Sequence, residues 1–223
     1  MSDFAAARFN MVESQIRPNK VRGRRLLDAL GNLPREAFVP SISAGIAYID
    51  ENVPVGTGRY LLEPMVLARL IEEAEIKETD RVLDIAPATG YSTAVLAKLA
   101  KEVVAVESDP ALVTQAVANL DRLQIKNASL QLGPLAEGWK ASAPYDVILV
   151  NGSAEILPAA LSPQLAEGGK LLIVMRESGP AAVAHKGEAR LYEKIRGNLS
   201  HRALFDANVK LLPGFEAKKH FAF

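Results

Sequence analysis

Apolar residues recur at helical spacing through the N-terminal part of the chain, at Phe4, Phe9, Val12, Ile16, Leu26, Leu27 and Leu30. Pro18 interrupts this pattern and Gly31-Asn32 ends it, which predicts helices over residues 4–32. Residues 33–64 hold several prolines and glycines and show little periodicity, so we expect a long connecting segment of the kind that often carries function. An amphipathic helix is predicted from Pro64, a residue suited to the first helical turn.

From residue 81 the pattern alternates between short apolar runs and helical segments. The apolar runs are "RVLDIA" (81–86), "EVVAVE" (102–107), "ASLQLG" (128–133), "YDVILVNG" (145–152) and "KLLIVM" (170–175). Helices are predicted between them, over 92–100, 110–123 and 157–169. Apolar strands that alternate with helices are typical of a parallel sheet covered on both faces. The last part, residues 189–215, predicts shorter strands added antiparallel at the sheet edge.

Composition and charge limit the classes of partner. The chain has 223 residues, 26 basic and 26 acidic side chains, 49% hydrophobic residues and no cysteine. Disulfides, thiolate metal sites and a cysteine nucleophile are therefore excluded. A balanced charge gives no field toward nucleic acid or an anionic membrane, so we expect neither as a partner. The N-terminal segment has no long apolar run typical of a signal peptide, and we expect a cytoplasmic protein.

Candidate chemistry gathers at the ends of the first two predicted strands. Ligands of open α/β sheets bind at the carboxyl ends of the strands, where residues 86–90 ("APATG") follow the first one. This loop lacks the G-x-G-x-x-G spacing of a dinucleotide site, and Gly90 is its one glycine. Glu107, at the end of the second strand, is placed to accept hydrogen bonds from both hydroxyls of a ribose. A ribose-bearing cofactor without a pyrophosphate loop points toward S-adenosylmethionine.

The chain resembles the protein-L-isoaspartate O-methyltransferase family over nearly its whole length. The resemblance is carried by "MVESQIRPNKVRGRRLLDALGNLPREAFVP", "AYIDENVPVGTG", "EPMVLARLIE", "DRVLDIAPATGYSTAVLA", "VVAVESDP", "NASLQLGPLAEGW", "PYDVILVNGSAEILPAAL" and "LAEGGKLLIV", in family order and spacing. It implies a Rossmann-like class I methyltransferase fold, in which a mostly parallel seven-stranded sheet has helices on both faces. It also implies S-adenosyl-L-methionine as cofactor and the α-carboxylate of isoaspartyl residues in damaged proteins as methyl acceptor. We expect an N-terminal helical extension and substrate loop over 1–63 and a methyltransferase domain over 64–223, forming a single structural unit.

The sequence departs from the family pattern at several contact positions. The glycine-rich run is replaced by residues 86–89, and the usual Gly-Asp after the third strand is Gly133-Pro134. A hydroxyl of the substrate loop is replaced by Leu62 in "YLLEP", and Asn151-Gly152-Ser153 replaces a threonine followed by small apolar residues. Two alternatives therefore stay open: a non-enzymatic binding or regulatory module, and a methyltransferase with another acceptor.

The strand ends and the resemblance together indicate the site residues. Cofactor contacts are expected at Asp84, Ala86, Pro87, Thr89, Gly90, Tyr91, Glu107, Ser108, Pro134, Leu135 and Asn151, and substrate-loop contacts at Val55, Gly56, Gly58, Leu62 and Glu63. Thr57 or Ser153 is the candidate for a replacement hydroxyl. Glu63 either repels a carboxylate substrate from within the site or faces solvent at the start of the helix that follows. No metal is expected, because His185, His201 and His220 lack ligand spacing.

Overall fold

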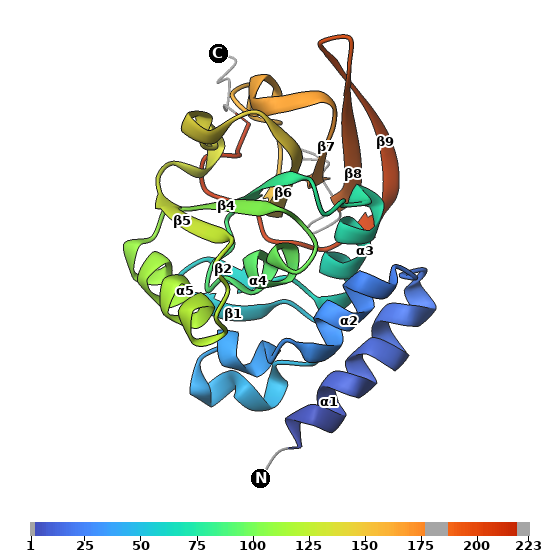
Figure 1. Cartoon of the computed structure of the whole chain (residues 1–223), viewed down its shortest axis with the longest axis vertical. Coiled ribbons are helices and arrows are strands. Elements are labelled where there is room, and N and C mark those ends of the chain that lie inside the picture. The colour runs from blue at the N-terminus through green and yellow to red at the C-terminus, as the bar shows by residue number, and fades with distance from the viewer. Residues whose placement is uncertain (1–2, 177–186, 218–223) are drawn as a thin grey trace, which may run out of the picture.

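The computed structural model describes residues 3–176 and 187–217, and its centre is a seven-stranded sheet in the order β5-β4-β3-β6-β7-β8-β9 (Figure 1). The strands are β3 (Arg81–Ile85), β4 (Glu102–Glu107), β5 (Ala128–Leu132), β6 (Tyr145–Ala154), β7 (Leu165–Arg176), β8 (Gly187–Ile195) and β9 (Asn198–Ala207). Strands β3 to β7 pair in parallel, while β8 and β9 add antiparallel at one edge. The chain builds outward from β3 in one direction and then returns to β6, so the strand order reverses between β3 and β6. Ligands of such sheets bind at this reversal.

Each of the five predicted apolar runs is a strand, and the antiparallel addition at the edge is confirmed. The expectation that these edge strands are short is wrong, because β8 has 9 residues and β9 has 10. The predicted helix over 157–169 is wrong: residues 162–164 form only a short 3-10 turn, and β7 begins at Leu165. Pro158 and Pro163 each remove a backbone donor from this stretch. Its start is held by the C-terminal segment instead, because the carbonyl oxygen of Phe215 accepts the N–H of Glu155.

In the described part of the chain the α-helices are α1 (Phe4–Asn10), α2 (Arg24–Asn32), α3 (Pro64–Ala74), α4 (Tyr91–Ala97) and α5 (Pro110–Arg122). Between α1 and α2 the chain makes a π-helical turn, Met11–Ile16, and a 3-10 turn, Arg17–Asn19, and then leaves the helix at Lys20 with φ +68°. Among residues 3–176 and 187–217, each helix is too short or too polar to cross a bilayer.

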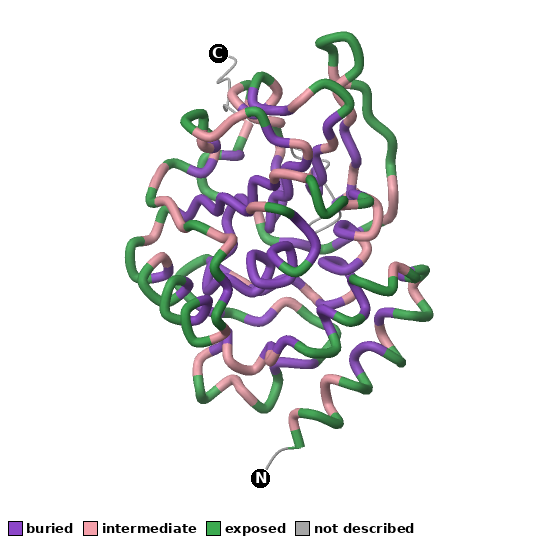
Figure 2. Tube along the Cα trace, in the orientation of Figure 1, coloured by how far each residue is buried: buried purple, intermediate pink, exposed green. Residues whose placement is uncertain are grey.

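The two faces of the sheet are covered differently. Alternate strand residues such as Val82 and Val103 share one buried cluster with the five helices, including the N-terminal ones. Their neighbours Leu83 and Val104 face a second cluster, covered by 3-10 turns and by the loop that ends at Phe215. Figure 2 shows both as a continuous buried interior. The N-terminal segment thus packs on the same core as the sheet, and the boundary at residues 63/64 stays a prediction.

A small hairpin lies in the connecting segment where the sequence showed little periodicity. Strands β1 (Val53–Gly56) and β2 (Arg59–Leu61) pair antiparallel around a turn in which Gly58 has φ +66°. They form a sheet of their own, separate from the seven-stranded one. Gly58 and Arg59 of this hairpin line one cavity together with Ala86 after β3 and Asn151 in β6. The hairpin therefore covers the point where the strand order reverses.

Candidate cofactor and substrate site

The loop after β3 keeps the backbone shape of a glycine loop although it has lost most of its glycines. Ala86, Ala88 and Gly90 all lie in the left-handed region, with φ of +62°, +52° and +93°. That region costs an L-residue about 1–2 kcal/mol relative to a right-handed conformation. The loop is held against the neighbouring strand, because the N–H of Ala86 donates to the carbonyl of Val106 at 2.9 Å. The turn is therefore imposed by its surroundings, which is why alanine can occupy two positions better suited to glycine.

Glu107 ends β4 beside this loop, and its carboxylate is fully used by the protein itself. The side chain is completely buried. Oε2 accepts the N–H of Ala88 at 3.1 Å, while Oε1 accepts the N–H groups of Ser108 at 2.7 Å and Asp109 at 3.2 Å. Oε1 also forms an ion pair with Nη2 of Arg59, whose side chain is 5% exposed. The acid predicted to hold a ribose thus carries a buried arginine.

Asp84, near the end of β3, is a second buried carboxylate with an internal role. It accepts hydrogen bonds from the hydroxyls of Ser92 at 2.8 Å and Thr93 at 2.7 Å, and from the amide of Asn151 at 2.6 Å. Burial raises the pKa of Asp84 to about 6, and the charge of Glu107 adds to this, while the three hydrogen bonds act in the opposite direction. Asp84 thus connects the start of α4 to β6 by hydrogen bonds and so helps to fix the loop at residues 86–90 between β3 and α4.

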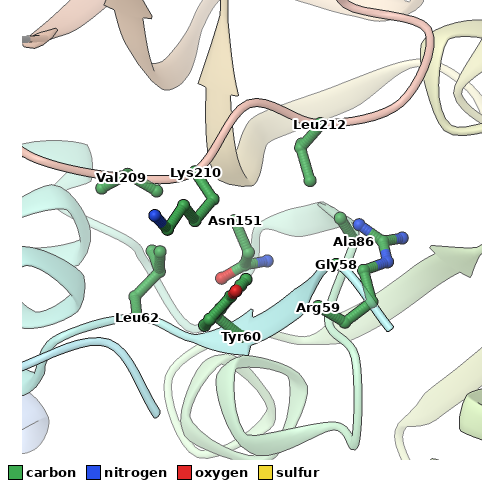
Figure 3. A pocket seen from close by; sticks show the side chains of 9 residues that line it. All are labelled: Gly58, Arg59, Tyr60, Leu62, Ala86, Asn151, Val209, Lys210 and Leu212. Atoms are coloured by element: carbon green, nitrogen blue, oxygen red, sulfur yellow. The ribbon is translucent and has the colours of Figure 1, made fainter. Parts of the chain in front are cut away.

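The space around these residues is small. A cavity of about 10 Å³ lies between the hairpin, the loop and the C-terminal segment, and Figure 3 shows its lining, made by Gly58, Arg59, Tyr60, Leu62, Ala86, Asn151, Val209, Lys210 and Leu212. A neighbouring cavity of about 10 Å³ is lined in part by Pro87 and Tyr91. Each has room for about one water molecule, whereas sites for small-molecule ligands measure about 300–1,000 Å³. Among residues 3–176 and 187–217, the chain's own side chains therefore leave no room for such a ligand in either of these two cavities.

The predicted substrate loop is divided between the hairpin and the start of α3. Val55 is buried in β1, whereas Gly56, Thr57 and Gly58 form the exposed tip. Leu62 is 3% exposed, and its carbonyl accepts Nη2 of Arg35 at 2.7 Å. The position that holds a hydroxyl in the family pattern is therefore an apolar residue turned into the core.

Glu63 matches neither of the two positions that the sequence left open, within the site or facing solvent, completely. It precedes α3 as the N-cap residue, yet its side chain makes no capping hydrogen bond and is only partly exposed. Burial raises the pKa of Glu63 to about 7, and the nearby charges of Asp50 and Glu51 raise it further. Near neutral pH this carboxyl is therefore only partly ionised, and it repels a carboxylate less than a fully ionised group does.

Neither of the two candidate hydroxyls, Thr57 and Ser153, lines either cavity, and a role for them stays a prediction. Ser153 is completely buried, and its Oγ donates to the carbonyl of Val209 at 2.9 Å. Its backbone N–H and C=O also bond to the C-terminal segment, at Lys210 and Leu212. Ser153 thus fixes that segment against β6. Thr57 lies exposed at the hairpin tip, away from the lining of either cavity.

The remaining predicted cofactor residues have separate surroundings. Thr89 is buried, and its hydroxyl donates to the carbonyl of Phe38 at 2.5 Å. Ser108 and Pro134 are exposed, while Leu135 is buried in the cluster on the far face of the sheet. The structure therefore brings Ala86, Pro87, Tyr91 and Asn151 to the lining of the two cavities and leaves Thr57, Pro134 and Ser153 outside it. Glu107 does not line either cavity but pairs with Arg59, which does.

Two buried arginines were missed from the sequence. Arg59 follows "VGTG", and Arg35 lies in "LPREAFVP". Arg35 is 0% exposed, and its Nε donates to the carbonyl of Ala47 at 2.6 Å. Alternation of apolar and polar residues in "VPVGTGRYL" is the signal that indicates a hairpin and puts Arg59 on the same face as Leu61. No comparable pattern marks Arg35.

Metal ligands do not gather within residues 3–176 and 187–217, where no three His, Asp or Glu side chains form a group that could hold an ion. His201 is exposed and packs against the ring of Tyr192, with ring centroids 5.1 Å apart. His185 and His220 lie outside the described residues.

Comparison with known proteins gives a consistent family. A model of the family Protein-L-isoaspartate(D-aspartate) O-methyltransferase (PCMT) matches residues 7–201. Protein-L-isoaspartate O-methyltransferase of Methylorubrum extorquens is 40% identical over 177 residues, which are 79% of this chain and 77% of that protein. Protein-L-isoaspartate O-methyltransferase 2 of Marinobacter nauticus is also 40% identical over 177 residues, 79% of this chain and 81% of its own.

Solved structures share the fold at lower identity. A protein-L-isoaspartate O-methyltransferase superposes with a TM-score of 0.79 at 24% identity, over 93% of this chain; the match spans 66% of that protein's chain. A Plasmodium falciparum structure, described as a putative enzyme of the same kind in complex with S-adenosyl-L-homocysteine, gives a TM-score of 0.77 at 22% identity, over 95% and 99% of the two chains. At these identities the likeness establishes the class I methyltransferase fold.

Proposed function

The chain belongs to the protein-L-isoaspartate O-methyltransferase family, and we propose that it transfers a methyl group from S-adenosyl-L-methionine to the α-carboxylate of isoaspartyl residues in proteins. The observation that carries this proposal is the family match through residues 7–201, which includes the hairpin, the loop after β3, Glu107 and Asn151, although the cavity lining at Val209, Lys210 and Leu212 lies beyond it. The enzyme is thus a protein carboxyl methyltransferase, and its partners are proteins or peptides that contain isoaspartyl residues.

The residues around the loop fit the cofactor in kind. Glu107 offers carboxylate oxygens for the two ribose hydroxyls, and the left-handed turn at Ala86 and Ala88 lets the backbone approach a ligand closely. Leu135 lies beyond the end of β5 and Asn151 lies in the last part of β6, where they would border the rest of the nucleoside. When bound, the cofactor supplies a methyl group activated by its sulfonium. The fit requires the side chains that now fill the cavity to move, since about 10 Å³ holds no nucleoside.

The acceptor makes a modest chemical demand on the protein. A carboxyl group with an ordinary pKa of about 4 is ionised at neutral pH, so no general base is needed. The chain mainly has to hold the carboxylate oxygen in line, and positioning of this kind contributes roughly 7–11 kcal/mol to catalysis. Lys210 lines the cavity and offers a positive charge to a carboxylate. The hydroxyl replaced by Leu62 is worth about 1.5–3 kcal/mol as a bond to a charged group, so we expect a rate roughly ten- to a hundredfold below that of a family member with that hydroxyl.

The location that suits this activity is the cytoplasm. The chain has no cysteine that would require an oxidising compartment, and its charges balance. We therefore infer that it acts on damaged proteins inside the cell.

The direct test is methyl transfer from labelled S-adenosyl-L-methionine to an isoaspartyl peptide. The peptide of the same sequence with a normal aspartyl residue is the matched control. We expect base-labile label in the isoaspartyl peptide alone. Turnover of neither peptide at saturating cofactor would reject the assignment of this acceptor.

A further inference from the structure

Arg59 occupies the carboxylate that the proposed function gives to the cofactor. Its guanidinium pairs with Oε1 of Glu107 in a contact where the two side chains are 5% and 0% exposed. It also lies 3.5 Å from the hydroxyl of Ser108. Resting on the proposed function, we infer that Arg59 is an internal competitor that sets the affinity for S-adenosyl-L-methionine, because the cofactor must displace it from Glu107.

Of the groups bound to Glu107, Arg59 is the one that can be exchanged. The other donors are the N–H groups of Ala88, Ser108 and Asp109 and the hydroxyl of Ser108 at 3.4 Å, and all of them belong to the two turns that shape the site. The guanidinium comes instead from β2, 48 residues away in sequence. Removal of the cation from a buried ion pair is strongly unfavourable, so Arg59 can leave only as other donors arrive at the carboxylate of Glu107. The two hydroxyls of a ribose are such donors.

The position of Arg59 in the fold allows this exchange. Strands β1 and β2 form their own two-stranded sheet and share no ladder with the seven-stranded one. The hairpin tip is exposed at Gly56, Thr57 and Gly58. A movement of the hairpin therefore breaks few backbone contacts, yet it withdraws Arg59 from Glu107 and Tyr60 from the cavity at the same time.

The Arg59–Glu107 pair lowers the apparent affinity, because the affinity falls in proportion to the fraction of molecules in which the site is open. In Arg59→Gln the cation is lost, and we expect S-adenosyl-L-homocysteine to bind at least tenfold more tightly by isothermal titration calorimetry. Arg59→Lys keeps the positive charge and is the matched control, with an expected Kd within threefold of the parent. Circular dichroism melting of each protein without ligand verifies that the variants are folded.

A second measurement uses the unmodified protein and does not depend on a variant that folds. Hydrogen exchange with and without S-adenosyl-L-homocysteine should show faster exchange in β1 and β2 and slower exchange at residues 86–90 when the ligand is bound. Most ligands protect the segments that cover them, so this opposite change in the hairpin is specific to displacement.

The outcomes separate this inference from the proposed function. An unchanged or weaker Kd in Arg59→Gln, binding by neither protein, or slower exchange in the hairpin would overturn the inference, because Arg59 would then not be what closes the site. Tighter binding by Arg59→Gln without methyl transfer to the isoaspartyl peptide would support the inference and count against the proposed acceptor alone.

Discussion

Arg35 provides the sharpest stability prediction, because it is a completely buried cation that holds the substrate loop from beneath. Its guanidinium donates to the carbonyls of Ala47 at 2.6 Å and Leu62 at 2.7 Å, and its Cζ lies 4.9 Å from the ring centroid of Tyr91. Burial lowers the pKa of Arg35 below its ordinary value, which reflects the cost of keeping this charge away from water. The perturbation we consider is Arg35→Met, which keeps much of the apolar volume and removes the donors.

The magnitude follows from these contacts. Each hydrogen bond from a charged group is worth about 1.5–3 kcal/mol, and a desolvated cation–aromatic contact adds up to about 2 kcal/mol. Removal of the buried charge offsets part of this loss of stability, since burying a charge in an apolar interior costs several kcal/mol. We therefore expect Arg35→Met to lower the free energy of unfolding by about 3 kcal/mol. For a chain of this size, that corresponds to a fall in Tm of roughly 6–12 °C.

Urea unfolding followed by circular dichroism measures this change, provided that the slope m is unchanged. Arg24→Met is the matched control, because the Arg24 side chain is 93% exposed and lies 3.8 Å from Asp28 in a surface pair. We expect the control to stay within about 0.5 kcal/mol of the parent. A loss of less than 1 kcal/mol in Arg35→Met would refute the reasoning that this arginine fixes the loop.

Three further predictions concern single positions. The pKa of Glu63 is about 7 in the folded protein against an ordinary 4.5, so the folded state loses stability as the pH rises from about 4.5 to 7. Glu63→Gln should therefore be more stable than the parent at pH 8 and equal to it at pH 4, whereas equal stability at both pH values would show that the carboxyl is freely solvated. Gly90→Ala should lower the free energy of unfolding in urea by about 1–2 kcal/mol, since φ is +93° and the new Cβ would lie 3.2 Å from a side-chain carbon of α5. The control Gly31→Ala has open space in α2 and should be neutral or stabilising by up to about 1 kcal/mol, and a larger loss of stability in the control than in Gly90→Ala would contradict a left-handed turn at residue 90. Ser153→Ala should lose about 1 kcal/mol of stability through its bond to the C-terminal segment and keep the parent kcat for the isoaspartyl peptide, while a hundredfold loss of kcat would restore Ser153 as a catalytic candidate.

The sequence was sufficient for the centre of the sheet because the strands β3, β4 and β6 are buried on both faces. "EVVAVE" is buried from Val103 onward, and its boundaries match those of β4. A short, nearly continuous hydrophobic run of this kind is typical of a strand in a parallel sheet that is buried on both faces. The acidic position at the end of that strand was also predictable, because strand ends are fixed by the alternation with helices.

The contacts of the site were beyond the sequence for a physical reason. The pairing of Arg59 with Glu107 joins residues 48 apart, and its existence depends on how a short hairpin folds over the sheet. The helix predicted over 157–169 is absent because Pro158 and Pro163 remove two backbone donors, and the residues just before it, Glu155 and Ile156, donate their N–H groups to Phe215 of the C-terminal segment. Local pattern records which residues are buried, whereas the partner of a buried charge is decided by tertiary packing.

The structure of the protein crystallised with S-adenosyl-L-homocysteine tests the central claim most directly. We predict that both ribose hydroxyls donate hydrogen bonds to the carboxylate of Glu107 and that Arg59 is withdrawn together with β2. A complex in which the Arg59–Glu107 pair is intact while the nucleoside is bound elsewhere would contradict it.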